Sequence, residues 1–187
     1  MMEFFLTYKD MLIEGTYETL LMTFASTVFA YIIGLPLGVT MVITDARGIS
    51  PHKTLNTVLG TIINIGRSIP FVILIVAVIP VTRFIVGKAI GPVAAIVPLT
   101  IAAAPFVARM VETALQEVDP GVVEAAKTMG ATNEQIALKV LLPEAVPSLI
   151  RGFSITTITL IGYSAMAGAF GAGGLGDIAI RYGHHRY

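Results

Sequence analysis

The 187-residue chain has no cysteine and few charged residues. Without cysteine it can form neither a disulfide nor a thiolate metal site, and it has no cysteine nucleophile. Charged residues make up 13% of the chain, well below the roughly 25% of an average globular domain. Acids balance bases, and no basic block occurs, so nucleic acid is not expected as a partner. No ligand set completes a metal site around the adjacent His184 and His185, which we interpret as a solvated tail.

Apolar residues are abundant instead: they make up 55% of the chain, and the mean hydropathy is +0.83. A membrane-spanning helix needs about 20 predominantly apolar residues. Four runs are long enough, at residues 19–43, 54–82, 89–108 and 152–175. Because lipid offers no partner to backbone polar groups, the sequence predicts an all-α, polytopic transmembrane helical bundle. The first run is too long for a signal peptide and follows an acidic N-terminus, so we expect a retained span, kinked at Pro36.

A polar segment separates the third and fourth runs and has signals for two short helices. Asp119 and Pro120 suit a helix start, and Gly130 suits a left-handed residue at a helix end. Thr132 has the spacing of a capping box for a second helix, which Pro143 is expected to stop or bend. The segment is therefore predicted to be a helix–glycine–helix elbow. An amphipathic hairpin on the lipid surface is the alternative, but such hairpins are rich in Lys and Arg and in bulky apolar anchors.

The elbow has the spacing E-A-A-x3-G-x9-V-x-L-P, which resembles the EAA loop of the membrane subunits of ABC importers. The resemblance implies a coupling loop at about residues 117–143 that docks into a groove of a cytoplasmic ATPase and transmits its movement. The residues that take the coupling positions are Glu124, Ala125, Ala126, Gly130 and Pro143.

Two further features suggest a translocation path or gate, each with a plainer alternative. Arg67 lies inside the second run, where a charge is costly unless it faces protein or water. It either lines the path or pairs structurally with an acid such as Glu112. The fourth run ends in closely spaced small residues, which serve either ordinary helix packing or a flexible gate that includes Tyr163, Ser164 and Met166.

Several strings narrow the resemblance to the permease subunits of methionine-import ABC transporters. They are the strings at residues 67–71, 94–100, 104–112 and 162–176, together with the EAA loop. The resemblance implies the type I importer fold, with a fifth span after the glycine-rich stretch. Because the chain stops at Tyr187, residues 1–187 are expected to be a C-terminally incomplete ABC transmembrane type-1 domain with four spans.

The same resemblance implies a homodimer in the bacterial cytoplasmic membrane, with two ATPase subunits and an extracytoplasmic binding lipoprotein. ATP and magnesium would bind the ATPase, and this chain would need no cofactor and catalyse nothing. Lys and Arg are almost evenly split between the two sides, so the resemblance decides the orientation: N-terminus outside and EAA loop cytoplasmic.

Three other interpretations compete with a methionine permease. A permease for another amino acid, an osmolyte or a metal complex would share the same loop. A stand-alone channel or ion-coupled carrier usually has intramembrane acids or histidines, and an enzyme needs converging catalytic groups. The four predicted runs contain no His, Asp or Glu, which disfavours the carrier and the enzyme.

Overall fold

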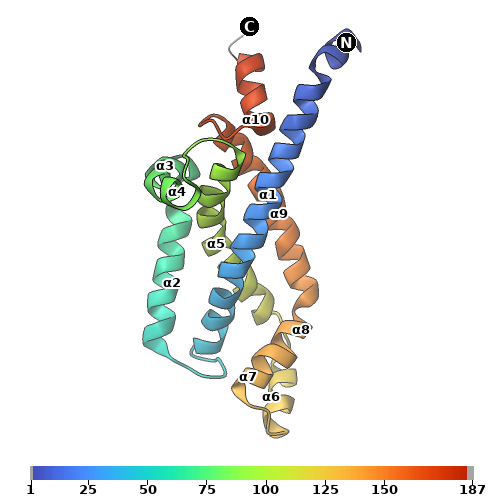
Figure 1. The fold of residues 1–187 in the computed structure, drawn as a ribbon. Coiled ribbons are helices and arrows are strands. Elements are labelled where there is room, and N and C mark those ends of the chain that lie inside the picture. Colours follow the sequence, from blue (N-terminus) through green and yellow to red (C-terminus); the bar gives the residue numbers. More distant parts are fainter. Residues whose placement is uncertain (1, 185–187) are drawn as a thin grey trace. The chain divides into compact units, whose positions relative to one another are not determined.

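The computed structural model describes residues 2–184 of the chain, with side chains for residues 8–183, so His185 lies outside the described residues. Its elements are all helical within this range (Figure 1). They are α1 (Met2–Thr44), α2 (Lys53–Ser68), α3 (Phe71–Ala77), α4 (Ile79–Val86), α5 (Pro92–Gln116), α6 (Pro120–Thr128), α7 (Asn133–Ile136), the π-helical turn η1 (Ala137–Leu141), α8 (Leu142–Glu144), α9 (Val146–Gly168), α10 (Gly174–Ile178) and a second π-helical turn, η2 (Ala179–His184).

Three of these helices are long and apolar enough to cross a membrane: residues 8–44 of α1, all of α5 and all of α9. A fourth span is counted only if α2 and α3 are taken together. Pro36 lies inside α1 without ending it. The described part of the chain therefore has three continuous candidate spans, and reaches the predicted four only if α2 and α3, bent by 101°, count as one span.

The second predicted span, 54–82, is wrong as a continuous helix. The chain leaves the helical conformation at Pro70, which has φ −58° and ψ 134°. Proline has no N–H and disfavours helix in the residue before it, so α2 ends at Ser68. Pro80 then fits the first turn of α4, and the segment becomes three helices.

The other predicted boundaries also shift. α5 continues to Gln116, so Arg109 and Glu112 belong to a helix and not to the polar connector. α9 ends at Gly168, and the positive φ angles of Gly171, Gly173 and Gly174 make the glycine-rich stretch a turn rather than the end of a span. α1 begins well before residue 19 and carries Glu18, so the expected absence of acids from the long helices is also wrong.

The chain divides into two compact units, and α1, α5 and α9 contribute to both. In the unit of residues 30–68 and 104–156, α1 packs closely on α5 at two glycines one helical turn apart. A Cβ on Gly34 would lie 2.7 Å from the Val107 side chain, and one on Gly38 would lie 2.5 Å from the Ala108 carbonyl oxygen. The two glycines therefore allow the backbones to approach, as small residues do between membrane helices.

In the unit of residues 1–29, 69–103 and 157–187, polar contacts tie α1 to the first turn of α10. The Gly174 amide donates to the Glu18 carboxylate at 2.7 Å, and the Leu175 amide donates to the Thr19 hydroxyl at 3.0 Å. Gly91 at the start of α5 donates its amide to the Gly171 carbonyl at 2.9 Å. These bonds satisfy backbone groups that a turn leaves without helical partners.

Many hydroxyl side chains of the described helices bond back to the carbonyl four residues earlier in the chain. Thr27 and Thr156 each donate to the carbonyl four residues earlier at 2.8 Å, and both side chains are completely buried. Thr19, Thr40, Thr44, Thr61, Thr82 and Ser154 make the same bond. Each of these hydroxyl groups is therefore hydrogen-bonded within its own segment and needs no partner from an apolar environment.

Candidate functional site

The segment between α5 and α9 forms the predicted elbow, within a single unit. α6 begins at Pro120, and the Asp119 carboxylate caps it by accepting from the Gly121 amide at 2.7 Å. The sequence prediction of this helix start is confirmed. The cap satisfies one of the free amides of the first turn.

Gly130 ends α6 in the left-handed conformation, with φ +80°. Its amide donates to the Lys127 carbonyl at 3.0 Å, and the next amide, of Ala131, donates to the Ala126 carbonyl at 3.1 Å. This pair of bonds defines a Schellman motif, in which the residue at the position of Gly130 must tolerate positive φ. The predicted role of Gly130 in the backbone is therefore confirmed.

The second arm of the elbow starts with the predicted capping box. The Thr132 hydroxyl accepts from the Gln135 amide at 3.3 Å, and the Gln135 side chain accepts from the Thr132 amide at 2.9 Å. Ile136, which follows, is completely buried and anchors this arm. Both arms of the elbow thus have defined first turns.

Pro143 was predicted to stop or bend the second arm; the helix continues through Pro143 and ends one residue later, at Glu144, so the stop does not lie at Pro143 itself. The chain widens before it into the π-helical turn η1, where the Leu142 amide bonds to the Ala137 carbonyl. A proline ring displaces the carbonyl four residues earlier, and a π-turn is one way to make room for it. Pro143 is exposed.

The elbow's coupling residues differ in exposure. Glu124, Ala125 and Gly130 are exposed, whereas Ala126 is only 4% exposed. The resemblance gives both alanines coupling positions, but Ala126 is buried and is not open to a partner. The surface open to a partner is therefore formed by Glu124, Ala125, Gly130 and Pro143, and we call it the elbow surface.

The two ends of the elbow are tied together at its base. The Ser148 hydroxyl, on α9, donates to the Glu117 carboxylate just after α5 at 2.5 Å. Arg151 donates to the Ser148 hydroxyl at 2.6 Å, and its guanidinium is 3.5 Å from the Glu117 carboxylate. Exposed ion pairs contribute little to stability, so this cluster is expected to contribute little to the free energy of folding.

A cavity of about 200 Å³ separates α6 from the loop between α1 and α2. Arg47, Glu124 and Lys127 are its charged lining residues, and Val123 and Leu141 contribute apolar surface. The cavity places the α1–α2 loop beside the elbow surface, a neighbour that sequence reasoning missed.

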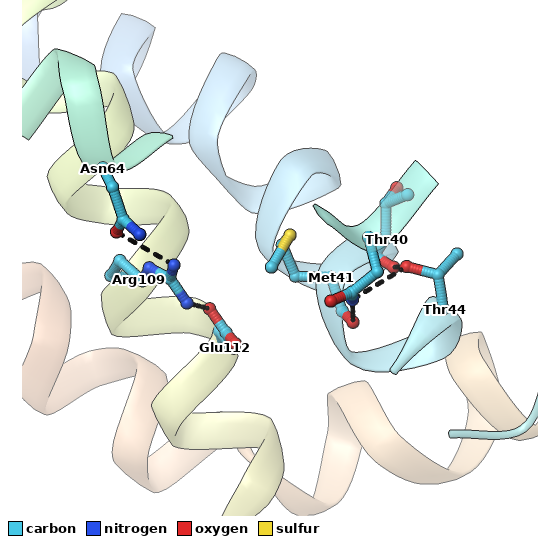
Figure 2. Close-up of polar contacts among 7 residues, drawn as sticks. Thr40, Met41, Thr44, Asn64, Arg109 and Glu112 are labelled. Atoms are coloured by element: carbon cyan, nitrogen blue, oxygen red, sulfur yellow. Dashed lines mark hydrogen bonds and ion pairs between the residues drawn. The ribbon is translucent and has the colours of Figure 1, made fainter. Parts of the chain in front are cut away.

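A second polar cluster links α5 to α2 in the same unit (Figure 2). The Arg109 guanidinium donates to the Glu112 carboxylate at 2.6 Å and to the side-chain amide oxygen of Asn64 at 3.0 Å. Glu112 is 14% exposed, so the pair is largely withdrawn from solvent. The expected partner of Arg67 is thus held by Arg109, and the predicted Arg67–Glu112 pair is wrong.

Asn56 makes a further contact from α2, with Met41 and Thr44, which are labelled in Figure 2. Its amide nitrogen donates to the Met41 carbonyl at 2.7 Å and to the Thr44 hydroxyl at 3.1 Å. The carbonyls of a last helical turn have no helical partner, so Asn56 caps the C-terminal end of α1. Neither Asn56 nor Arg109 was a candidate from the sequence. The partners of Asn56 and the Asn64 partner of Arg109 are distant along the chain, whereas the local Arg109–Glu112 pair was overlooked.

The candidate path residues lie in different surroundings. Arg67 is exposed and forms none of the ion pairs found among the described residues. The ring of Tyr163 stacks on Phe71, with 4.8 Å between ring centroids. Ser164 is buried and donates to the Ile161 carbonyl, whereas Met166 is 48% exposed. The Met166 side chain can therefore contact groups outside this chain, whereas the buried Ser164 side chain cannot.

Comparison with known proteins decides the family. The model of binding-protein-dependent transport system inner membrane components matches residues 34–182. The chain belongs to this family. Membership makes it a membrane component of a transport system and not an enzyme, as the sequence predicted.

Individual relatives agree with the family model. The probable D-methionine transport system permease protein MetI of Vibrio cholerae is 54% identical over 185 residues, which cover 99% of this chain and 82% of the relative. The D-methionine transport system permease protein MetI of Escherichia coli K12 is 55% identical over 158 residues, covering 84% of this chain and 73% of the relative. The predicted resemblance to methionine-import permeases is confirmed.

Solved structures confirm the fold. A chain of the MetNI methionine ABC transporter in an inward-facing conformation has a TM-score of 0.94 at 54% identity, with 95% of this chain and 82% of that chain covered. A chain of an amino acid ABC transporter has a TM-score of 0.75 at 24% identity, with 97% and 83% covered. The second match supports the fold alone, and together they confirm the all-α permease architecture.

Proposed function

We propose that the chain forms the membrane path of an ATP-driven methionine importer and that its elbow couples this path to a cytoplasmic ATPase. The observation that carries the coupling is the exposed, doubly capped elbow surface. Capping at both arms holds the elbow in one shape, and its small exposed side chains leave room for the wall of a groove. The methionine substrate is taken from the relatives named above.

Movement at the elbow has a physical route into the membrane helices. α6 follows α5 after three residues, and the Glu117–Ser148–Arg151 cluster holds the start of α9 beside that junction. Arg109 and Glu112 then connect α5 with Asn64 of α2. A push on the elbow would therefore reach three membrane helices through direct contacts.

The partners and orientation belong to the same proposal. Two copies of the chain would form the path, with two ATPase subunits that bind ATP and magnesium and a binding lipoprotein that delivers methionine. This arrangement requires the elbow on the cytoplasmic side and the N-terminus outside, in a bacterial cytoplasmic membrane. Arg67, Tyr163, Ser164 and Met166 would contribute to the path or gate, with Met166 the residue most open to it.

Uptake of labelled methionine tests this function. A bacterial strain without its own methionine importer would express the ATPase and the binding lipoprotein, with or without this permease. Uptake is expected only with the permease. If the strain takes up another amino acid but no methionine, the assignment of methionine as the substrate would be wrong.

Ala125→Arg tests the coupling site in the same strain. Because Ala125 is exposed, a large charged side chain should leave folding intact but prevent the elbow from entering a groove. Co-purification of the ATPase and methionine uptake should both be lost, whereas Ala125→Ser, the matched control, should retain them. Normal uptake by Ala125→Arg would contradict docking at the elbow surface.

A further inference from the structure

A cavity of about 210 Å³ lies between the α3–α4 segment and the start of α5, within one unit. Its walls are mainly apolar and include Ile75, Ile79, Ile90 and Phe170. None of its lining residues is acidic, and Arg83 is the only cation among them. The cavity therefore combines a space for an apolar group with one positive charge at its wall.

Lys88 adds a second positive charge at this place. Its amine lies 3.9 Å from the position of a Cβ on Gly91, which also lines the cavity. Arg83 and Lys88 are both exposed, and neither takes part in the ion pairs formed among the described residues. Residues 69–111 contain no Asp or Glu. The two charges therefore have no neutralising acid along their own segment.

The carboxylates that line the neighbouring cavity come from α1 and α10. Glu14, Glu18 and Asp177 line a neighbouring cavity that shares only Gly91 with this one. Glu18 accepts from the Gly174 amide, and Asp177 is paired with Arg181 at 2.8 Å. These acids therefore leave the charges of Arg83 and Lys88 available to an anion.

The outer side of α4 is apolar and exposed beside these charges. Phe84 is 91% exposed, Ile85 62% and Val81 44%, and only Thr82 in this helix is buried. An eight-residue helix rises only about 12 Å, so α4 alone cannot cross a membrane. An apolar face next to unpaired cations on such a short helix matches the boundary between acyl chains and headgroups.

We propose that this place binds an anionic phospholipid, with part of an acyl chain in the cavity and the phosphate on Arg83 and Lys88. Basic pockets between membrane helices bind anionic headgroups in this way. A free amino acid fits less well, because its ammonium group would find no acid among the lining residues. A zwitterionic lipid lacks the net charge that two cations select. The proposal does not depend on which solute is transported.

Fluorescence quenching tests the proposal, since the chain contains no tryptophan. Phe84→Trp places one probe beside the cavity, in the assembled transporter reconstituted into vesicles of phosphatidylcholine and phosphatidylglycerol. Brominated acyl chains are carried by one lipid or the other at equal mole fraction. The parent complex, without a tryptophan in the permease, gives the background from the partner subunits.

Brominated phosphatidylglycerol is expected to quench more strongly than brominated phosphatidylcholine. Enrichment around the probe should approach roughly fivefold per cation at low mole fraction. Adding Arg83→Gln and Lys88→Gln should remove the preference but leave ordinary quenching, and Arg83→Lys should retain it. Ile62→Trp, at a 60% exposed position of α2, is the matched control and should show no preference.

Three results would overturn the proposal. One is equal quenching by the two lipids, and another is a preference that survives loss of both cations. The third is a probe at position 84 that no brominated lipid reaches, which would mean that a second copy or the binding protein covers α4. Soluble glycerol phosphate separates a lipid site from a free-phosphate site. It should leave the quenching preference nearly unchanged at a lipid site, where the acyl chain also binds, and its removal of the preference would show that the phosphate group alone is bound.

Discussion

Gly130 is the single residue that sets the angle between the two arms of the elbow. Its φ of +80° is strained for any side chain, and no atom lies within 4 Å of a Cβ built there. Gly130→Val should therefore cost about 1–3 kcal/mol through the backbone alone, without a clash. We expect the elbow to change direction and the ATPase rate to lose its dependence on methionine uptake, measured in proteoliposomes.

Gly183→Val provides the control for Gly130→Val. Gly183 also has no atom within 4 Å of a built Cβ, but its φ is not positive. The same side chain there should leave transport and its coupling to ATP hydrolysis nearly unchanged. Equal coupling in both variants would remove the link between the backbone of Gly130 and the function of the elbow.

At the scale of the element, the second arm depends on the capping box at its start. Thr132→Ala removes the hydroxyl that accepts from Gln135 and should destabilise this arm by about 1 kcal/mol. Amide hydrogen exchange should then quicken in α7 and η1. Thr128→Ala is a matched control, because the Thr128 hydroxyl only bonds back to the Ala125 carbonyl of its own helix. Similar exchange in the two variants would contradict a special role for the cap.

The elements also show how far local sequence signals reach. The elbow was predictable in detail because Asp119, Gly130 and Thr132 act on backbone groups within a few residues. Pro70 and Pro80 are sequence signals for the break after α2. The break was missed because the continuous apolar composition of residues 54–82 was given more weight. Membrane hydropathy measures composition and is insensitive to such breaks.

Contacts between distant segments were beyond a single sequence. Arg109 bonds to Asn64, 45 residues away, and Glu18 bonds to Gly174, 156 residues away. Nothing in the local pattern of either residue identifies its partner. The alternative in which Arg67 pairs with Glu112 failed for a different, local reason: Arg109, three residues before Glu112 on the same helix, already holds its carboxylate.

At the scale of the whole molecule, transport requires that the path stay closed until the ATPase acts. Met166 is the candidate for this closure because it is half exposed on α9 and has a flexible, apolar side chain. Met166→Ala should raise the ATPase rate without substrate or allow methionine to leak through proteoliposomes. Ile158→Ala, at a 68% exposed position of the same helix, is the control and should leave both unchanged. Parent-like behaviour of Met166→Ala would exclude it as a closing residue.

The hydroxyl groups that bond to their own helices affect how the chain enters a membrane during synthesis. α9 has the lowest mean hydropathy of the three long helices, 1.2 against 1.9 and 1.8, partly because it contains several Thr and Ser residues. Thr156 and Ser154 already share their protons with the carbonyls four residues earlier. The helix that enters the membrane is therefore effectively less polar than its amino-acid sequence suggests. Asn is larger and has more hydrogen-bonding groups to satisfy, so replacing these residues with Asn would make the helix more polar and harder to insert.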